Sequence, residues 1–317
     1  MRFIKDITEG ERVNEVYLCR KKQSALTKAG KPYENLTLQD KTGTLDAKIW
    51  EPGSMGIDDF DELNYIFVTG DVTSFQGALQ LNVKRVRVAS EGEYVEADYL
   101  PCSSRDTEEM YQELMEIIAT VKAPYMQSLL DMYFGQEEFA KKFKFHSAAK
   151  SVHHGFVGGL LEHTLGVTKN CDFYAQMYPM LDRDLLITAA VFHDIGKLTE
   201  LSPFPQNDYT DEGQLLGHIM IGAKQVEESI AQIPNFPPVK ARELIHCILA
   251  HHGELEYGSP KKPAIAEAVA LSFADNIDAK METMKEALGN VAPNDVRWQG
   301  FNRLFESNIR RTSPEEF

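Results

Sequence analysis

Short segments in which apolar and polar positions alternate fill the first quarter of the chain. The last of them, ALQLNVKRVRV, places Leu79, Leu81 and Val83 on one face and then slips by one residue, as a β-bulge would. Four earlier segments are rich in β-branched and aromatic residues, and turn residues separate them: VNEVYLCR, YENLTLQD, TLDAKIW and YIFVTGDV. We therefore predict strands over residues 13–90.

Five short strands in a segment of this length suit a small closed barrel. We predict a five-stranded OB-type barrel over residues 1–90, an architecture that commonly binds single-stranded nucleic acid. SH3-like barrels have a similar strand pattern and stay open as an alternative. The acidic segment 51–64 falls between the third and fourth strands, where OB barrels often carry a helix or loop.

The periodicity changes after residues 91–106, which have no repeating pattern and are interpreted as a linker. Asp106 with Glu109 predicts a helix N-terminus, and apolar residues then recur at helical spacing over 107–290. The fold class is therefore multidomain, β followed by all-α. The remaining tail, 291–317, carries aromatic residues that suit docking on the body or on another subunit. Helices are predicted over 156–177, 183–194, 213–232, 237–252 and 262–288.

The composition argues against several classes of protein. No apolar run approaches the roughly 20 residues of a membrane span, and the N-terminal residues do not resemble a signal peptide. The four cysteines lie far apart without a CxxC pair, which fits reduced thiols and disfavours a cysteine-based zinc site. We therefore expect a cytoplasmic location and no membrane partner.

The net charge of −15 is unevenly distributed along the chain. Residues 1–90 hold 13 basic and 13 acidic side chains, so the helical part carries the deficit. Within the barrel segment, Lys21, Lys22 and Lys28 belong to a locally basic stretch that could contact a phosphate backbone. A solvated hairpin would explain the same pattern.

Aromatic residues on the predicted strands include candidates for stacking on bases. Most aromatics on such strands belong to the core, so only a minority are expected to be exposed. Trp50, at a strand end beside Glu51 and Pro52, is the preferred candidate; the others are Tyr33, Tyr65, Phe67 and Phe75.

All nine histidines lie in the predicted helical part. His193 and Asp194 end an apolar helix, and adjacent helical side chains point about 100° apart, so the pair can hold one ion from two directions. Singly, His163 could be a satisfied core histidine and Asp275 the partner of a basic residue. Together with the pair they favour metal binding, because an unpaired buried carboxylate is costly.

This order of residues resembles the HD superfamily of metal-dependent phosphohydrolases, named for its His-Asp pair. The resemblance implies that one ion is bound by His163, His193, Asp194 and Asp275. Two further elements, GQLLGHIMIGA and ILAHHG, look like the additional ligands of two-metal members. They imply a second ion bound by a bridging Asp194, His218 and His251, with His252 as a ligand or a phosphate contact.

The ligand types also indicate which metal ions and which reaction are expected. Imidazole with carboxylate favours Mn, Fe, Co, Ni or Zn over Mg or Ca, and an open octahedral site fits Mn or Fe best. The resemblance implies in-line hydrolysis of a phosphodiester with two such ions, most simply Mn. Asp194 would bridge the ions, and Lys197 would neutralise charge on the transferring phosphate.

The whole chain resembles one family more closely. A barrel with QDKTGTLDAKIWEP followed by HHGFVGGLLEHT and VFHDIGKL is similar to the YhaM family of bacterial 3′–5′ exoribonucleases. That resemblance implies that the barrel holds single-stranded RNA, with single-stranded DNA as a further candidate, while the helical domain releases nucleoside 5′-monophosphates. A homo-oligomer is expected as well. A cyclic-dinucleotide substrate is disfavoured, because ELEYGSPKKP stands where that branch has a GYP-type motif.

Other interpretations stay open at this point. His153 and His154 lie beside flexible glycines and could bind the terminal phosphate or ribose, or could simply cap a helix. The chain could also be a one-metal HD hydrolase of free nucleotides, with the barrel used for oligomerisation. A third alternative is a non-catalytic nucleic-acid-binding factor with a structural metal site.

Overall fold

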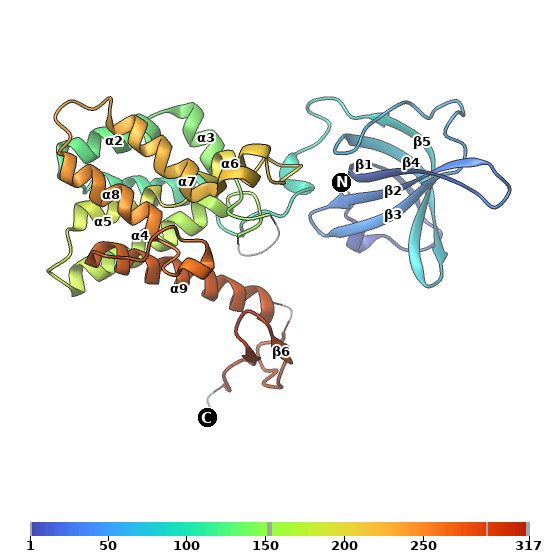
Figure 1. The fold of residues 1–317 in the computed structure, drawn as a ribbon. Helices are drawn as coiled ribbons and strands as arrows, with labels where there is room; N and C mark the ends of the chain where they lie inside the picture. The colour runs from blue at the N-terminus through green and yellow to red at the C-terminus, as the bar shows by residue number, and fades with distance from the viewer. Residues whose placement is uncertain (1, 151–153, 290, 315–317) are drawn as a thin grey trace. The chain divides into compact units, whose positions relative to one another are not determined.

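The computed structural model describes residues 2–150, 154–289 and 291–314. The chain divides into two compact units (Figure 1): a β unit of Met1–Cys102 with the short segment Phe204–Gln206, and a helical unit of Ser103–Pro203 and Asn207–Phe317. Each unit has a hydrophobic core of its own.

Five strands form the first unit. They are β1 (Arg12–Leu26), β2 (Pro32–Asp40), β3 (Gly43–Ile49), β4 (Tyr65–Phe75) and β5 (Ala78–Val88). They close into a barrel in the order β1-β2-β3-β5-β4, in which β3 and β5 pair in parallel and the other pairs are antiparallel. This confirms the predicted β plus all-α fold class with its five-stranded barrel.

The pattern slip in β5 is a β-bulge, as predicted. The pairing with β4 passes from Thr69 opposite Arg85 to Gly70 opposite Val83, so Lys84 is the extra residue. The bulge restores the alternation, and Leu81, Val83 and Val86 are all buried in the barrel core.

Part of the segment interpreted as a linker packs within the β unit. It contains a short 3₁₀ helix, η2 (Glu96–Asp98), and the rings of Tyr94 and Tyr99 lie 3.9 and 5.2 Å from that of Tyr65. Tyr99 and Leu100 are buried. Aromatic packing therefore orders residues whose sequence shows no period.

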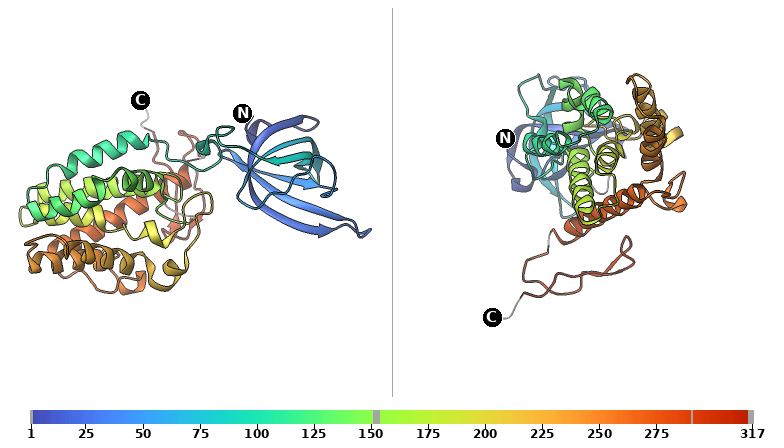
Figure 2. Two further views of the ribbon diagram at one scale, coloured as in Figure 1. Left: turned by 90° about the horizontal axis from the view of Figure 1, so that it is seen from above. Right: turned by 90° about the vertical axis from the view of Figure 1, so that its left-hand side faces the viewer.

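The helical unit is built around a helix that is buried along most of its length. In α5, every residue from Leu185 to Phe192 is buried, and the helix contacts α4, α8 and α9. Figure 2 shows the helices packed as a bundle. The helices are α1 (Thr107–Ile118), α2 (Pro124–Phe134), α3 (Glu137–Phe145), α4 (Gly159–Met177), α5 (Arg183–Phe192), α6 (Lys197–Glu200), α7 (Asp211–Ile230), α8 (Pro238–Ala250) and α9 (Ala266–Leu288).

The ends of α4, α5, α7, α8 and α9 lie within four residues of the predicted ranges, and α7 differs from the prediction in its interior as well. The Asp106 side chain accepts hydrogen bonds from the N–H groups of Glu108 and Glu109, which confirms the predicted cap of α1. In α7 the backbone leaves helical geometry at Gly217, whose φ is 71°. A kink of this kind has no signature in an apolar period.

Beyond α9 the tail forms a short hairpin of β6 (Phe301–Asn302) and β7 (Ser307–Asn308). The guanidinium of Arg311 donates to the carbonyls of Leu288 and Val291, which ties the tail to the end of α9. None of the helices within the described ranges is both long enough and apolar enough to cross a lipid bilayer. The cytoplasmic location stays a prediction.

Candidate active site

The site lies where the buried helix α5 ends. Phe192 is the last residue of α5, His193 follows with helical backbone angles, and both His193 and Asp194 are buried. Because α5 is packed on all sides, the two side chains are held rigidly at its C-terminal end. They meet side chains from α4 and α9, two helices that contact α5.

Four of the predicted ligands converge on one point. His163 Nε2 lies 3.1 Å from His193 Nε2, 3.3 Å from Asp194 Oδ2 and 3.2 Å from Asp275 Oδ1. His193 Nε2 is 3.4 Å from Asp194 Oδ2. Ligand atoms that bind one ion at roughly 2.1 Å and at right angles are about 3 Å apart, so these spacings suit a shared octahedral cation.

The other oxygen of Asp194 faces a second group of imidazoles. Asp194 Oδ1 is 3.3 Å from His218 Nε2 and 3.6 Å from His251 Nε2. His218, His251 and His252 each offer a nitrogen within 4.8 Å of the others. The structure therefore brings together all seven predicted ligands in two groups that share Asp194.

The two groups contain five histidines, and the hydrogen bonds of their imidazole rings determine which ring nitrogen faces the site. In each ring Nδ1 lies against an acceptor, so Nδ1 carries the proton and Nε2 presents its lone pair to the cluster. The acceptors are Asp278 for His163, Ala190 O for His193, Glu200 for His218, Ile248 O for His251 and Tyr257 O for His252.

Among the residues that the structure describes, three atoms of the cluster are buried without a hydrogen-bond partner: Asp194 Oδ1, His218 Nε2 and His251 Nε2. Buried polar atoms are rarely left unpaired, and each such case calls for an explanation. Here all three atoms are electron-pair donors that point at one another. A divalent cation satisfies such a set, so the residues fit a metal site.

The pKa values of His163 and Asp194, in the first group of ligands, also indicate a cation site. Burial alone would lower the pKa of His163, but hydrogen bonds to Asp194, Asp275 and Asp278 raise it well above its usual value. Burial would raise the pKa of Asp194, but the charges of Lys197 and His193 hold it well below its usual value. The site therefore keeps its carboxylates ionised and stabilises positive charge.

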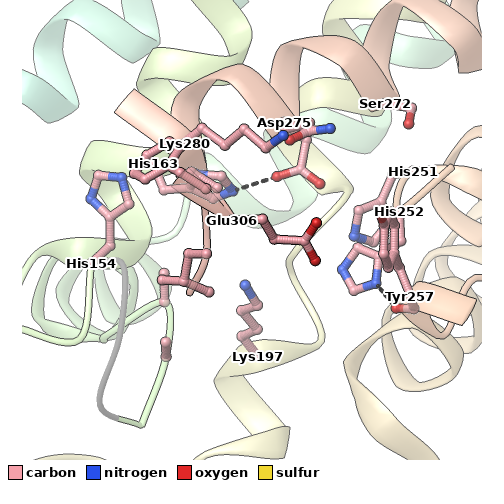
Figure 3. Close-up of a pocket in the computed structure, with 16 residues that line it drawn as sticks. His154, His163, Lys197, His251, His252, Tyr257, Ser272, Asp275, Lys280 and Glu306 are labelled. Carbon is pink, nitrogen blue, oxygen red and sulfur yellow. Dashed lines mark hydrogen bonds and ion pairs between the residues drawn. The ribbon is translucent and has the colours of Figure 1, made fainter. Parts of the chain in front are cut away.

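Lys197 occupies the first position of α6, directly after the His-Asp pair. Its Nζ lies 2.6 Å from Asp194 Oδ2, and its side chain is largely buried. Burial opposes the charged form, but the carboxylate of Asp194 outweighs this and raises the pKa of Lys197. The positive charge of Lys197 thus lines the cavity (Figure 3).

Two carboxylates that the sequence analysis missed support the ligands. Asp278 Oδ2 accepts a hydrogen bond from His163 Nδ1 at 2.8 Å, and Glu200 Oε1 accepts one from His218 Nδ1 at 3.0 Å. Asp278 Oδ2 also lies 3.0 Å from His154 Nε2. These contacts orient the imidazole rings, a role in which carboxylates commonly raise ligand basicity.

Glycines make both supporting contacts possible. A Cβ at position 166 would lie 2.1 Å from Asp278 Oδ1, so only glycine leaves room for this carboxylate beside α4. The positive φ of Gly217 turns the backbone so that the N–H of His218 also donates to Glu200 Oε1, at 3.0 Å. The kink in α7 therefore positions His218, a predicted ligand.

Replacing Asp278 by asparagine is expected to weaken binding of the first ion. The amide is a poorer acceptor for His163 Nδ1–H, and loss of such a supporting contact typically reduces metal affinity by about 10- to 100-fold. Titration calorimetry with Mn²⁺ measures this change. Asp172→Asn on the same helix as His163, where Asp172 pairs with Arg183, is the matched control and should leave the affinity unchanged.

A cavity of about 700 Å³ opens over the cluster. In Figure 3, His163, Asp275, Lys197 and the His251-His252 pair surround it. This is room for a nucleotide-sized ligand. His154, predicted to contact substrate, also lines the cavity, although its Nε2 lies against Asp278. His153 lies outside the described residues.

Comparisons with known proteins agree with this geometry. The model of the HD domain matches residues 160–280. A 3′-5′ exoribonuclease YhaM from Bacillus velezensis is 34% identical over 303 residues, which cover 93% of this chain and 95% of the relative. A 3′-5′ exoribonuclease YhaM from a Geobacillus species is 33% identical, over 90% of this chain and 88% of the relative.

The chain belongs to the YhaM family of 3′-5′ exoribonucleases. This membership confirms the family resemblance and the prediction of a hydrolase, since the shared sequence spans both the barrel and the HD domain. The clustered histidines and aspartates of the HD domain indicate divalent-metal binding.

Solved structures also resemble parts of the chain. The second OB-fold domain of replication protein A from Methanococcus maripaludis is 17% identical, with a TM-score of 0.22, and covers 29% of this chain and 96% of that domain. The protein PriB from Ralstonia solanacearum is 14% identical, also with a TM-score of 0.22, and covers 25% of this chain and 97% of that protein.

The barrel of this YhaM-family chain presents an aromatic pair at its surface. The ring of Trp50 stacks on that of Tyr33 at 5.3 Å, its Nε1 donates to Asn82 Oδ1 at 2.9 Å, and 47% of the residue is exposed. The ammonium of Lys48 lies over both rings. Trp50 is thus held in place with much of its surface free.

The three predicted phosphate-contacting lysines differ in their surroundings. Lys21 and Lys28 are exposed. Lys22 is largely covered: its Nζ donates to the carbonyl of Phe60 at 2.7 Å and lies 3.6 Å from a carboxylate oxygen of Glu34. A lysine with partners inside its own domain contributes less to a free basic surface than the charge count suggests.

Proposed function

We propose that this chain hydrolyses single-stranded RNA from the 3′ end to nucleoside 5′-monophosphates, with two transition-metal ions bridged by Asp194. The observation that carries the proposal is the position of Asp194, whose two oxygens face separate groups of imidazole Nε2 atoms. Family membership supplies the polarity and the RNA substrate.

The first ion would be held by His163, His193, Asp194 and Asp275, and the second by Asp194, His218, His251 and His252. Such ions lower the pKa of bound water and stabilise charge on a phosphate that undergoes in-line displacement. We propose Mn²⁺ as the physiological ion, because nitrogen and oxygen donors in an open octahedral arrangement suit Mn or Fe.

The side chains around this cluster have roles of their own. Lys197 and Lys280 line the cavity and would attract the scissile phosphate and offset its negative charge as the bond to the 3′-oxygen of the preceding nucleotide breaks. Asp278 and Glu200 would keep the imidazoles of His163 and His218 aligned. Because Lys197 is held by Asp194, it needs little reorganisation to act on the phosphate.

The barrel would hold the RNA strand upstream of the site. Trp50 and Tyr33 form a stacking platform for bases, and the exposed Lys21 and Lys28 would attract the backbone. Single-stranded DNA can stack on the same platform, so we propose it as a secondary substrate.

Replacing Trp50 by alanine is expected to weaken RNA binding. Stacking of a base on an aromatic side chain contributes roughly 1–3 kcal/mol, which corresponds to an affinity about 5- to 150-fold lower. Fluorescence anisotropy with labelled single-stranded RNA measures the loss. Trp50→Phe keeps an aromatic face and should retain most of the affinity; equal losses in both variants would exclude stacking as the cause.

We also propose that the chain forms a homo-oligomer. On α9, Val269, Phe273, Ile277 and Met281 recur every four residues and are all exposed, so they form an apolar stripe on one face. Light scattering should give a mass above that of one chain, and Phe273→Glu should shift it towards the monomer. A single-chain mass for the unmodified protein would contradict self-association.

Products distinguish the proposed reaction from hydrolysis of free nucleotides. Single-stranded RNA, a blunt RNA hairpin and a mixture of ribonucleoside triphosphates are incubated separately with the Mn²⁺-loaded protein. We expect nucleoside 5′-monophosphates from single-stranded RNA alone. Release of phosphate or pyrophosphate from the triphosphates, with intact RNA, would instead identify a nucleotide hydrolase.

A further inference from the structure

The tail hairpin reaches the cavity above the metal cluster. Its turn, residues 303–306, connects β6 to β7, and Leu304, Phe305 and Glu306 line the same cavity as Lys197 and Asp275. Figure 3 shows the carboxylate of Glu306 among the side chains of Asp275, Lys197 and His252. None of the sequence motifs assigned a role to this turn.

The hairpin is tied to the helix that carries a predicted ligand. Ile309 is buried, and its carbonyl accepts a hydrogen bond from the N–H of Gln299. Arg311 donates to the carbonyl of Leu288, the last residue of α9. Since Asp275 lies on α9, the turn and this ligand belong to one connected element.

The backbone at Glu306 has a conformation that is uncommon for a residue other than glycine. Its φ of 49° lies in the left-handed region, which residues other than glycine seldom adopt. Such conformations persist where the surrounding structure imposes them, and they are frequent at ligand-binding sites. Here Glu306 is the last residue of the hairpin turn 303–306, and its side chain lines the cavity.

A carboxylate in this position is unexpected on charge alone. The substrate of the cavity is a phosphodiester, and two negative charges at close range repel each other. Glu306 makes no hydrogen bond or ion pair with any residue that the structure describes. Glu306 is exposed to solvent in the cavity, and an ionised carboxylate only accepts hydrogen bonds, so a substrate group that it binds must be a donor.

The end of an RNA strand carries such donors. The terminal ribose has adjacent 2′- and 3′-hydroxyl groups, and two carboxylate oxygens can accept from both. When the scissile phosphate lies over the metal cluster, this ribose is the next group towards the 3′ end. An internal ribose has a phosphate on its 3′-oxygen, which a carboxylate would repel.

We propose that Glu306 recognises the free 3′ end by accepting hydrogen bonds from the terminal 2′- and 3′-hydroxyls, while Phe305 contacts the terminal base. The proposal deepens the function proposed above and rests on it. It explains how a cavity open to solvent selects the last nucleotide: a strand that continues, or one that ends in a 3′-phosphate, places negative charge against Glu306.

The test compares two RNA oligonucleotides of one sequence, ending in a 3′-hydroxyl or a 3′-phosphate. The unmodified protein should hydrolyse the 3′-hydroxyl form at least about tenfold faster. The 3′-hydroxyl donates a hydrogen bond to the charged Glu306, whereas the 3′-phosphate is repelled by it. Glu306→Gln should lose most of this preference, because it should hydrolyse the 3′-hydroxyl oligonucleotide more slowly and the 3′-phosphate oligonucleotide faster. Glu286→Gln, an exposed glutamate on α9, is the matched control.

Two results would overturn the proposal. One is a preference for the 3′-hydroxyl that is the same in Glu306→Gln as in the unmodified protein. The other is loss of a bound Mn²⁺ ion in that variant, which would assign Glu306 to the metal. Fluorescence anisotropy of the same oligonucleotides without added metal gives the preference without turnover, so failure of hydrolysis alone would count against the proposed function and not against end recognition.

Discussion

Asparagine in place of Asp194 is expected to reduce hydrolysis of single-stranded RNA by at least about a thousandfold. Asp194 contributes Oδ2 to the first group of ligands and Oδ1 to the second, so the change affects both ions at once. Metal ions supply several kcal/mol of transition-state stabilisation, and about 1.4 kcal/mol corresponds to a factor of ten in rate. Rates from single-turnover reactions at saturating Mn²⁺ measure the loss.

The effect of Asp194→Asn on stability must be separated from its effect on the rate of hydrolysis. Asp194→Asn leaves Lys197 buried without its ion-pair partner, and an uncompensated buried charge is destabilising. The double variant Asp194→Asn with Lys197→Met removes both charges and should recover stability but not activity. Asp211→Asn, at the exposed start of α7, is the control for the chemical change alone. Activity close to that of the unmodified protein in Asp194→Asn would contradict the bridging role.

Removing the imidazole of His218 is expected to reduce the metal content from two ions to one. His218 lies against Asp194 Oδ1 and is oriented by Glu200, and it belongs to the second group alone. The first group, built on His163, His193 and Asp275, stays complete. Because one of two ions is lost, the rate should fall by roughly 100- to 1000-fold.

Metal analysis of the purified His218→Ala protein, alongside its rate on RNA, checks this expectation. The matched control is His246→Ala, since His246 lies on α8 outside the cluster and accepts a hydrogen bond from the N–H of Ala264. One ion per chain in the unmodified protein would contradict the two-ion arrangement and would favour the one-metal alternative.

The sequence singled out the candidate ligands of the first group because each has an unusual local setting, whereas the resemblance to two-metal HD proteins supplied His218, His251 and His252. His163 and Asp275 are polar residues within apolar helices, and His193 with Asp194 follows a helix that is buried along most of its length. A buried polar residue needs a partner, so several of them in one domain point to a common one. The structure then places these side chains together, at distances that only the packing of α4, α5 and α9 could determine.

The supporting contacts could not be predicted in the same way. Asp278 and His163 are 115 residues apart, and their contact depends on the packing of α9 against α4 and on the space left by Gly166. One signal was present: Asp278 follows Asp275 by three residues, so both carboxylates lie on one face of a helix. The kink at Gly217, which directs His218, left no periodic signal.

The same limit applies at both ends of the chain. Counting charges placed Lys22 in a basic stretch that could contact phosphate, and only the structure shows its contacts with the carbonyl of Phe60 and the carboxylate of Glu34. The tail was predicted to dock, but which of its residues reaches the cavity depends on the hairpin turn at 303–306. The local sequence pattern predicts the helices, the strands and the candidate ligands. Tertiary packing determines which side chains remain free to bind substrate.

Metal ions held by Asp194 and its neighbours are expected to support degradation of RNA from the 3′ end. The most direct measurement is incubation of metal-stripped protein with 5′-labelled single-stranded RNA, followed by addition of Mn²⁺, for the unmodified protein and for Asp194→Asn. We predict a ladder that shortens from the 3′ end only after Mn²⁺ is added and only with the unmodified protein. RNA that is bound but stays intact under every metal tried would contradict the account.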